Sequence, residues 1–218
     1  MSAKAKFAVV LSGCGVYDGS EIHEAVLTLL AIDRAGGAYQ CFAPDAPQMH
    51  VINHVLGAPT DEVRNVLVES ARIARGAILP LSQYDPADFD VLIFPGGFGA
   101  AKNLCTFAVD GPGCTVDPDA ARAIAATHAA KKPIGALCIA PALIAKVLGK
   151  IEVTIGNDQG TADAIAAMGG KHQNRSHGEV CIDAANKVVT TPCYMLKSTI
   201  GQIADGASAA VAALLQLV

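Results

Sequence analysis

The residue with the clearest chemical potential is a cysteine at position 138. It lies in Ala136-Leu137-Cys138-Ile139-Ala140, between an apolar run that predicts a strand and an alanine-rich run that predicts a helix. Small side chains two positions before and after the cysteine permit the tight turn of a nucleophile elbow. A helix N-terminus also favours a thiolate, through its free N–H groups and its dipole. We expect Cys138 to be a nucleophile; the alternative is a buried cysteine that fits a crowded strand end.

A glycine pair is the expected partner of this thiol. Gly96 and Gly97 follow the apolar run Val91–Phe94, which predicts another buried strand. Because glycine lets backbone amides approach a ligand closely, the N–H groups of Gly97 and Ile139 are expected to form an oxyanion hole. The alternative is an ordinary tight turn. Gly96 and Asn103, in the same segment, are candidate pocket residues.

Two carboxylates, Glu21 and Glu24, lie one turn apart at the start of a predicted helix and therefore share a face. This helix begins at the carboxyl edge of the strands, with Ser20 as its expected cap. One carboxylate is expected to exchange protons with Cys138. In the alternative, both are solvated acids that complement the helix dipole. The residues alone leave open which of the two is the partner, and Glu21 is kept as a candidate pocket residue.

The first predicted turn, Gly13–Gly19, begins like a dinucleotide-binding fingerprint, but Asp18 stands where the third glycine belongs. A carboxylate there would repel a pyrophosphate and crowd the packing of the helix. We therefore expect no nicotinamide cofactor, and we keep Cys14 and Asp18 as candidate pocket residues. His172 and His177 lie on a polar segment without a third ligand nearby, so no metal site is expected.

These residues need a scaffold that brings several strand ends together. Short apolar runs predict strands at 6–12, 39–43, 91–94, 133–137, 152–155, 179–183 and 187–191. Helical periodicity predicts helices at 21–34, 60–75, 117–130, 140–148, 161–168 and 196–217. The alternation predicts one α/β domain over residues 1–218, a three-layer sandwich with a mostly parallel sheet and an ordered insertion at about residues 45–90. Sites in such folds lie at the carboxyl ends of the strands.

Composition excludes several functional classes. The 218 residues are 52% hydrophobic and 17% charged, which favours a large core over disorder. A net charge of −4 without a basic cluster argues against nucleic acid as a partner. No apolar run reaches the roughly 20 residues of a membrane span, and the first run is too short for a signal peptide, so we expect a cytosolic protein. Seven cysteines without a C-x-x-C pair argue against a disulfide framework and structural zinc. The apolar excess predicts a homodimer or larger homo-oligomer.

Three motifs resemble a known superfamily. Segments 11–24, 95–103 and 138–141 are similar to the ThiJ/PfpI superfamily and, within it, to the ElbB-type isoprenoid-biosynthesis proteins with an amidotransferase-like domain. The likeness covers nearly the whole chain and implies the flavodoxin-like fold of class I glutamine amidotransferases. The family spacing, ten residues back from Arg34, selects Glu24 over Glu21 as the partner of Cys138.

Some members of this superfamily are glyoxalases that convert methylglyoxal or glyoxal to lactate or glycolate without glutathione, using a cysteine and a glutamate. The resemblance therefore implies that Cys138 is the nucleophile and Glu24 the acid–base group, acting on a small oxoaldehyde without metal or organic cofactor. Other members have a histidine where this chain has Ile139 or Gly156. This departure implies a weak, low-turnover lyase. Two alternatives stay open: a non-catalytic redox-sensing or protein-binding protein, and an amidase or amidotransferase-like enzyme.

Overall fold

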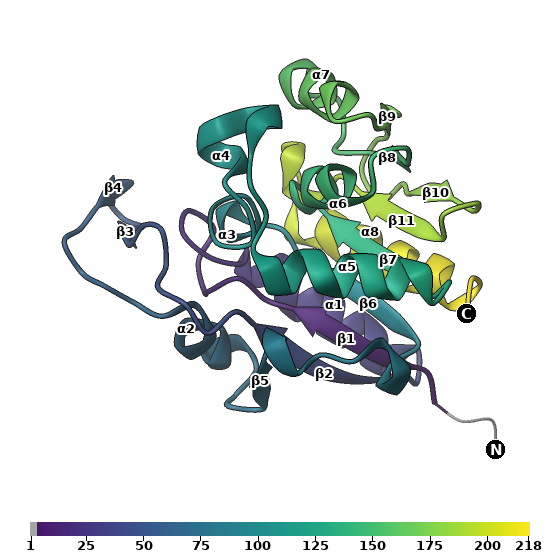
Figure 1. Ribbon diagram of the computed structural model, residues 1–218, viewed down its shortest axis with the longest axis horizontal. Helices are drawn as coiled ribbons and strands as arrows, with labels where there is room; N and C mark the ends of the chain where they lie inside the picture. Colours follow the sequence, from purple (N-terminus) through teal and green to yellow (C-terminus); the bar gives the residue numbers. More distant parts are fainter. Residues whose placement is uncertain (1–3) are drawn as a thin grey trace.

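The computed structural model describes residues 4–218, in which a seven-stranded sheet lies between two layers of helices (Figure 1). The strand order is β10-β11-β7-β6-β1-β2-β5, and every neighbouring pair in this sheet is parallel except β10 with β11. The predicted three-layer α/β fold with a mostly parallel sheet is confirmed.

The elements of the central sheet and its helices follow in chain order. The strands are β1 (Lys6–Val10), β2 (Ala38–Ala43), β5 (Ile78–Pro80), β6 (Val91–Phe94), β7 (Ile134–Leu137), β10 (Cys181–Asp183) and β11 (Val188–Thr191). The helices are α1 (Ile22–Arg34), α2 (Val66–Ile73), α3 (Phe98–Lys102), α4 (Phe107–Asp110), α5 (Pro118–Ala129), α6 (Ala140–Leu148), α7 (Gln159–Ala167) and α8 (Ile200–Leu215). Two small sheets pair β3 (Ile52–Asn53) with β4 (Ala58–Pro59), and β8 (Glu152–Val153) with β9 (Lys171–His172). Among residues 4–218, no helix has the length and apolar character of a membrane span.

Alternate side chains of the central strands build a core on each face of the sheet. Ala8 and Val10 of β1 belong to the core beneath α5 and α6, whereas Phe7 and Val9 belong to the core beneath α1 and α8. All four residues are completely buried, which is why the run is apolar at every position instead of alternating. With both faces covered, the carboxyl ends of the parallel strands remain as the accessible edge.

The strand order reverses beside β1, and this reversal positions the site. The chain passes from β1 to β2 and β5 on one side, and then returns to β6, β7 and β11 on the other. Such a reversal leaves a crevice at the carboxyl ends of the strands. The turns after β1, β6, β7 and β11 all reach this edge.

Two helices begin later than the sequence predicts. The helix predicted at 60–75 begins at Val66, because Asn65 caps it through a hydrogen bond to the Val68 N–H. The helix predicted at 196–217 begins at Ile200, where Thr199 forms a capping box. Capping fixes the first helical residue more narrowly than periodicity does.

The segment predicted as an insertion, residues 45–90, has two structurally different parts. The β3–β4 hairpin projects from the body of the protein, whereas α2 and β5 return to the edge of the central sheet (Figure 1). The strand predicted at 152–155 is shorter than expected and lies outside the central sheet, because β8 pairs with β9 instead.

Candidate active site

Cys138 occupies a strained turn between β7 and α6. Its φ is 60°, in the left-handed region that side chains other than glycine rarely adopt. Such a conformation costs about 1–3 kcal/mol and persists when the surroundings hold it. Here the Cys138 N–H donates to the Thr191 carbonyl at 3.0 Å, which ties the turn to β11, and Pro141 lies in the first turn of α6. The structure therefore contains the strand–turn–helix geometry of a nucleophile elbow.

Glu24 is the carboxylate that reaches this thiol. Its side chain is completely buried and hydrogen-bonded to the side chain of Cys138. Its Oε2 accepts the Gly96 N–H at 3.0 Å, and its Oε1 accepts the Tyr194 N–H at 3.1 Å. Burial raises the pKa of Glu24 to about 8, because removal from water disfavours the charged form. Glu24 therefore carries a proton for most of the time at neutral pH.

The thiol of Cys138 is also held in its neutral form. Burial, followed by the neighbouring Glu24, raises the pKa of Cys138 well above its ordinary value. Hydrogen bonds from the N–H groups of Gly97 and Ile139 to the sulfur oppose this shift without reversing it. The expected thiolate at the helix N-terminus is therefore wrong for the resting protein, because burial outweighs the helix dipole. Glu24 is the member of this pair that loses its proton first.

Gly96 and Gly97 are required at this point of close approach. A Cβ on Gly96 would overlap the Cys138 Cβ and the Glu24 carboxylate. Gly97 has φ 95° and ψ 160°, a conformation open to glycine, and a Cβ there would overlap the backbone of Glu21. The two amides predicted as an oxyanion hole, those of Gly97 and Ile139, therefore lie together at the Cys138 sulfur.

A cavity of 430 Å³ opens onto Cys138. Its apolar lining residues are Val16, Phe98, Ala101, Phe107, Ala108, Ile139 and Met195, and its polar ones are Glu21, Asp158, Thr161 and Tyr194. Asp158 caps α7 by accepting the Thr161 N–H at 2.8 Å, and hydrogen bonds from the Thr161 side chain and N–H lower the pKa of Asp158. Two carboxylic side chains thus face a largely apolar chamber.

Glu21 has a different role from Glu24. Its Oε2 accepts the Glu24 N–H at 2.7 Å, so Glu21 caps α1 while its side chain lines the cavity. Ser20, the expected cap, instead accepts the Ser12 N–H at 2.9 Å and is buried. The structure therefore separates two carboxylates that the sequence left equivalent.

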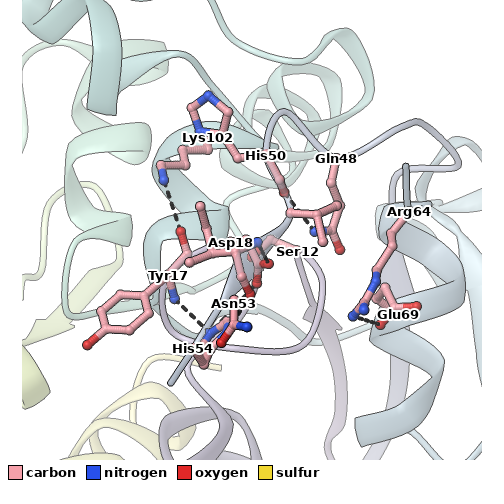
Figure 2. A network of polar contacts seen from close by, with 12 residues as sticks. Ser12, Tyr17, Asp18, Gln48, His50, Asn53, His54, Arg64, Glu69 and Lys102 are labelled. Carbon is pink, nitrogen blue, oxygen red and sulfur yellow. Dashed lines mark hydrogen bonds and ion pairs between the residues drawn. The ribbon is translucent and has the colours of Figure 1, made fainter. Parts of the chain in front are cut away.

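Asp18, a predicted pocket residue, is not among the residues that line the cavity. It is buried, its Oδ2 accepts the Ile52 N–H at 2.7 Å, and its Oδ1 lies 3.8 Å from His54 Nε2. Figure 2 shows this network, in which His54 Nε2 accepts a hydrogen bond from the Tyr17 N–H and Lys102 Nζ donates one to the Tyr17 carbonyl. Asp18 anchors the β3–β4 hairpin to the first turn.

Asn103 and Cys14, also predicted as pocket residues, are not lining residues of the cavity either. The Asn103 side-chain amide donates to the carbonyls of Ser12 and Asp18, each at 2.8 Å. These hydrogen bonds stabilise the backbone of the turn after β1. Burial and the nearby Glu69 raise the pKa of Cys14. Within residues 4–218, no cluster of three or more histidine, cysteine or acidic side chains is arranged to hold a metal ion.

The turn after β11 is the part of the site that sequence reasoning missed. Cys193 has φ 45°, and the next residue, Tyr194, donates its N–H to Glu24 and is a lining residue of the cavity. The Tyr194 Oη lies 2.8 Å from His23 Nδ1. The end of the strand predicted at 187–191 was an available signal, because residues that follow parallel strands gather at one edge.

Comparison with known proteins identifies close relatives. No protein-family model matches the chain. The chain is 53% identical over 223 residues to the human glutamine amidotransferase-like class 1 domain-containing protein 3, covering 98% of this chain and 83% of the relative. It is 52% identical over 224 residues to the rat ES1 protein homolog, covering 98% and 84%. Both relatives are named as mitochondrial, which overturns the cytosolic location expected from the sequence.

Solved structures extend the likeness to the fold. The isoprenoid biosynthesis protein with an amidotransferase-like domain from Ehrlichia chaffeensis superposes with a TM-score of 0.92 at 38% identity, covering 98% of this chain and 99% of that one. A ThiJ/PfpI domain protein from Brachyspira murdochii, at 17% identity and a TM-score of 0.59 over 98% of this chain and 99% of that one, shares the fold alone. With half of its residues identical over nearly its whole length, the chain belongs to the family of ES1 and glutamine amidotransferase-like class 1 domain proteins.

Proposed function

We propose that this protein is a glutathione-independent glyoxalase that converts methylglyoxal or glyoxal to lactate or glycolate. The observation that carries the proposal is the buried carboxyl of Glu24, with a pKa of about 8, hydrogen-bonded to Cys138 beside a largely apolar cavity. A general base works best when its pKa lies near the operating pH. Removal of a proton from carbon is the kind of step that needs such a base.

The first step is addition of the thiol to the aldehyde. The ionised form of Glu24 takes the thiol proton as the Cys138 sulfur bonds to the aldehyde carbon, and the aldehyde oxygen becomes an alkoxide. The N–H groups of Gly97 and Ile139 are directed at the sulfur and so lie beside this developing charge. Transfer of the proton from Glu24 to the alkoxide completes a hemithioacetal.

The second step moves hydrogen between the two substrate carbons. The Glu24 carboxylate removes the hydrogen of the hemithioacetal carbon, whose electron pair forms the double bond of an enediol. Glu24 then returns the proton to the neighbouring carbon, and loss of the proton from the hydroxyl on the first carbon yields a thioester of the 2-hydroxy acid. Water breaks the carbon–sulfur bond and restores the thiol. One carbon is oxidised and its neighbour is reduced, so the sum is the addition of one water, without an external oxidant.

Amidase or amidotransferase chemistry has less support at this site. Such a triad needs a histidine beside the thiol, and no histidine is among the described residues that line the cavity. Gly156, where other superfamily members have a histidine, has φ 95°, and a Cβ there would lie 2.9 Å from the Leu196 side chain. A larger residue does not fit at that position without movement of the Leu196 segment.

The test is lactate formation from methylglyoxal in buffer free of glutathione. Wild-type protein is expected to produce lactate, whereas Cys138→Ala should fall to the rate of buffer alone. Cys41→Ala is the matched control, because Cys41 is a buried core residue of β2 and should leave the rate unchanged. Equal rates for wild type and Cys138→Ala would refute the proposal and favour a redox-sensing or binding role.

A further inference from the structure

We propose that Tyr194 is a second catalytic acid of this site and that His23 positions it. In this proposal, which rests on the proposed glyoxalase function, the Tyr194 phenol donates a proton to the substrate's ketone oxygen as the enediol forms. The phenol regains a proton from the hydroxyl on the first carbon as the thioester forms. Without a histidine at position 139 or 156, the resemblance assigns every proton transfer to Glu24. The structure contains a different histidine within reach of the cavity, one residue before Glu24.

The geometry joins Tyr194 to both halves of the site. Its backbone N–H donates to Glu24 Oε1 at 3.1 Å, and Tyr194 is a lining residue of the cavity onto which Cys138 opens. Its Oη lies 2.8 Å from His23 Nδ1, and the two rings are 5.9 Å apart between centroids. His23 Nδ1 also lies 3.9 Å from Glu21 Oε1. A His23 ring that carries its proton on Nδ1 donates to the phenol oxygen and leaves the phenol O–H free to point at substrate.

The chemistry requires a donor where Tyr194 stands. When Glu24 removes the hydrogen on carbon, negative charge develops on the oxygen of the neighbouring carbon. The amides of Gly97 and Ile139 lie at the sulfur, so in this mechanism they stabilise the first oxygen, the one on the carbon bonded to sulfur. A separate hydrogen-bond donor is needed for the second oxygen, one carbon further from the thiol.

Among the described residues that line the cavity, Tyr194 has the hydroxyl that is available to donate a hydrogen bond to substrate. Glu21 and Asp158 present acceptor oxygens, and the Thr161 hydroxyl is hydrogen-bonded to Asp158. Burial, followed by the charges of Glu21 and Glu24, raises the pKa of Tyr194, so the phenol keeps its proton. Proton donation to an enediolate is therefore the role that this hydroxyl can fill.

The experiment compares Tyr194→Phe with wild type in the methylglyoxal assay. The variant keeps the ring and the backbone N–H to Glu24, so only the hydroxyl is lost. We expect kcat to fall about 10²- to 10³-fold, as for removal of one donor to a developing oxyanion, with little change in KM. Tyr17→Phe is the matched control, because the Tyr17 ring lies 5.0 Å from the His54 ring and Tyr17 is not a lining residue of the cavity.

A second pair of variants tests the role of His23. His23→Leu removes the hydrogen bond to Tyr194 and is expected to lower kcat about tenfold at unchanged KM. His23→Asn restores a donor near the position of Nδ1 and should recover most of this loss. If both variants are equally impaired, the histidine acts by packing alone, and its positioning role is refuted.

Alkylation of Cys138 by iodoacetamide separates the possible failures. Tyr194→Phe should label at the wild-type rate, since the Glu24–Cys138 pair is intact. Full activity in Tyr194→Phe, with Cys138→Ala inactive, would overturn this inference and leave the glyoxalase proposal standing. A changed labelling rate would overturn it too, because the lost activity would then come from the pair itself. No lactate from wild type would refute the proposed function, and this inference with it.

Discussion

Replacement of Glu24 by glutamine should change how the stability of the fold depends on pH. The pKa of Glu24 is raised from its ordinary value of 4.5 to about 8 by burial. The folded state therefore binds this proton more tightly than the unfolded chain does. Stability is unaffected below pH 4.5 and declines as pH rises toward 8, by about 1.4 kcal/mol per pH unit and about 5 kcal/mol in total.

Glutamine at this position is neutral at every pH and removes this decline. It has one acceptor oxygen, so either the Gly96 or the Tyr194 N–H loses its partner. A buried N–H without a partner costs about 1–3 kcal/mol at all pH values. We therefore expect wild type to be the more stable protein at pH 5 and Glu24→Gln the more stable at pH 9, with the two curves crossing between these values.

Urea unfolding at pH 5 to 9 measures this difference. The chain has no tryptophan, so circular dichroism of the helices is the appropriate signal. Glu21→Gln is the matched control: it alters a carboxylate one turn away, and the Glu24-dependent decline should persist in it. Parallel curves for wild type and Glu24→Gln would show that Glu24 ionises in the fold as readily as in the unfolded chain, which would refute the argument from burial.

Three further outcomes are expected. The wild-type kcat/KM for methylglyoxal should rise about tenfold per pH unit up to about pH 8 and then level off, because the reaction needs ionised Glu24. A flat profile between pH 6 and 9.5 would refute the role of Glu24 as the general base. Phenylglyoxal should have a higher kcat/KM than methylglyoxal, because the 430 Å³ cavity is lined largely by apolar side chains. A phosphorylated oxoaldehyde should have a lower kcat/KM than methylglyoxal, because Glu21 and Asp158 repel it. The reverse order would show that the cavity does not select substrate. Light scattering should give a mass of at least twice the 22.2 kDa of one chain, because α1 exposes Ile22, Val26 and Leu30 on one face at helical spacing. A measured mass of one chain would exclude the homodimer.

Several features of the site could be predicted from the sequence, because they depend on local physics. The run 91–94 and the run 134–137 are apolar on both faces, which predicts buried parallel strands whose ends meet at one edge. The small residues around Cys138 predict a tight turn, and the observed φ of 60° at Cys138 agrees with this prediction. The glycine pair at 96 and 97 after a buried strand predicts a tight turn, and the fold then brings Glu24, Cys138 and the backbone of Glu21 so close that a Cβ there would overlap them.

Other features depend on contacts that no local pattern contains. Glu21 and Glu24 lie on the same face of a helix in the sequence, and only packing against Gly96 and Tyr194 encloses Glu24. Tyr194 lies 170 positions from Glu24 in the chain, so its hydrogen bond exists only once β11 lies beside β7. The sequence suggests that Asp18 could contact a ligand, but in the structure its carboxylate accepts the Ile52 N–H of the hairpin.

The protonation state of the site is the clearest case of tertiary control. Helix position alone predicts a thiolate at Cys138, and the fold produces a neutral thiol beside a protonated carboxyl instead. The helix dipole is a property of the local element, whereas exclusion of water requires the whole sheet edge to close around the pair. Local sequence patterns thus indicate which residue types stand at the site. Their protonation states follow from the fold, because the cost of burying a charge depends on everything that surrounds it.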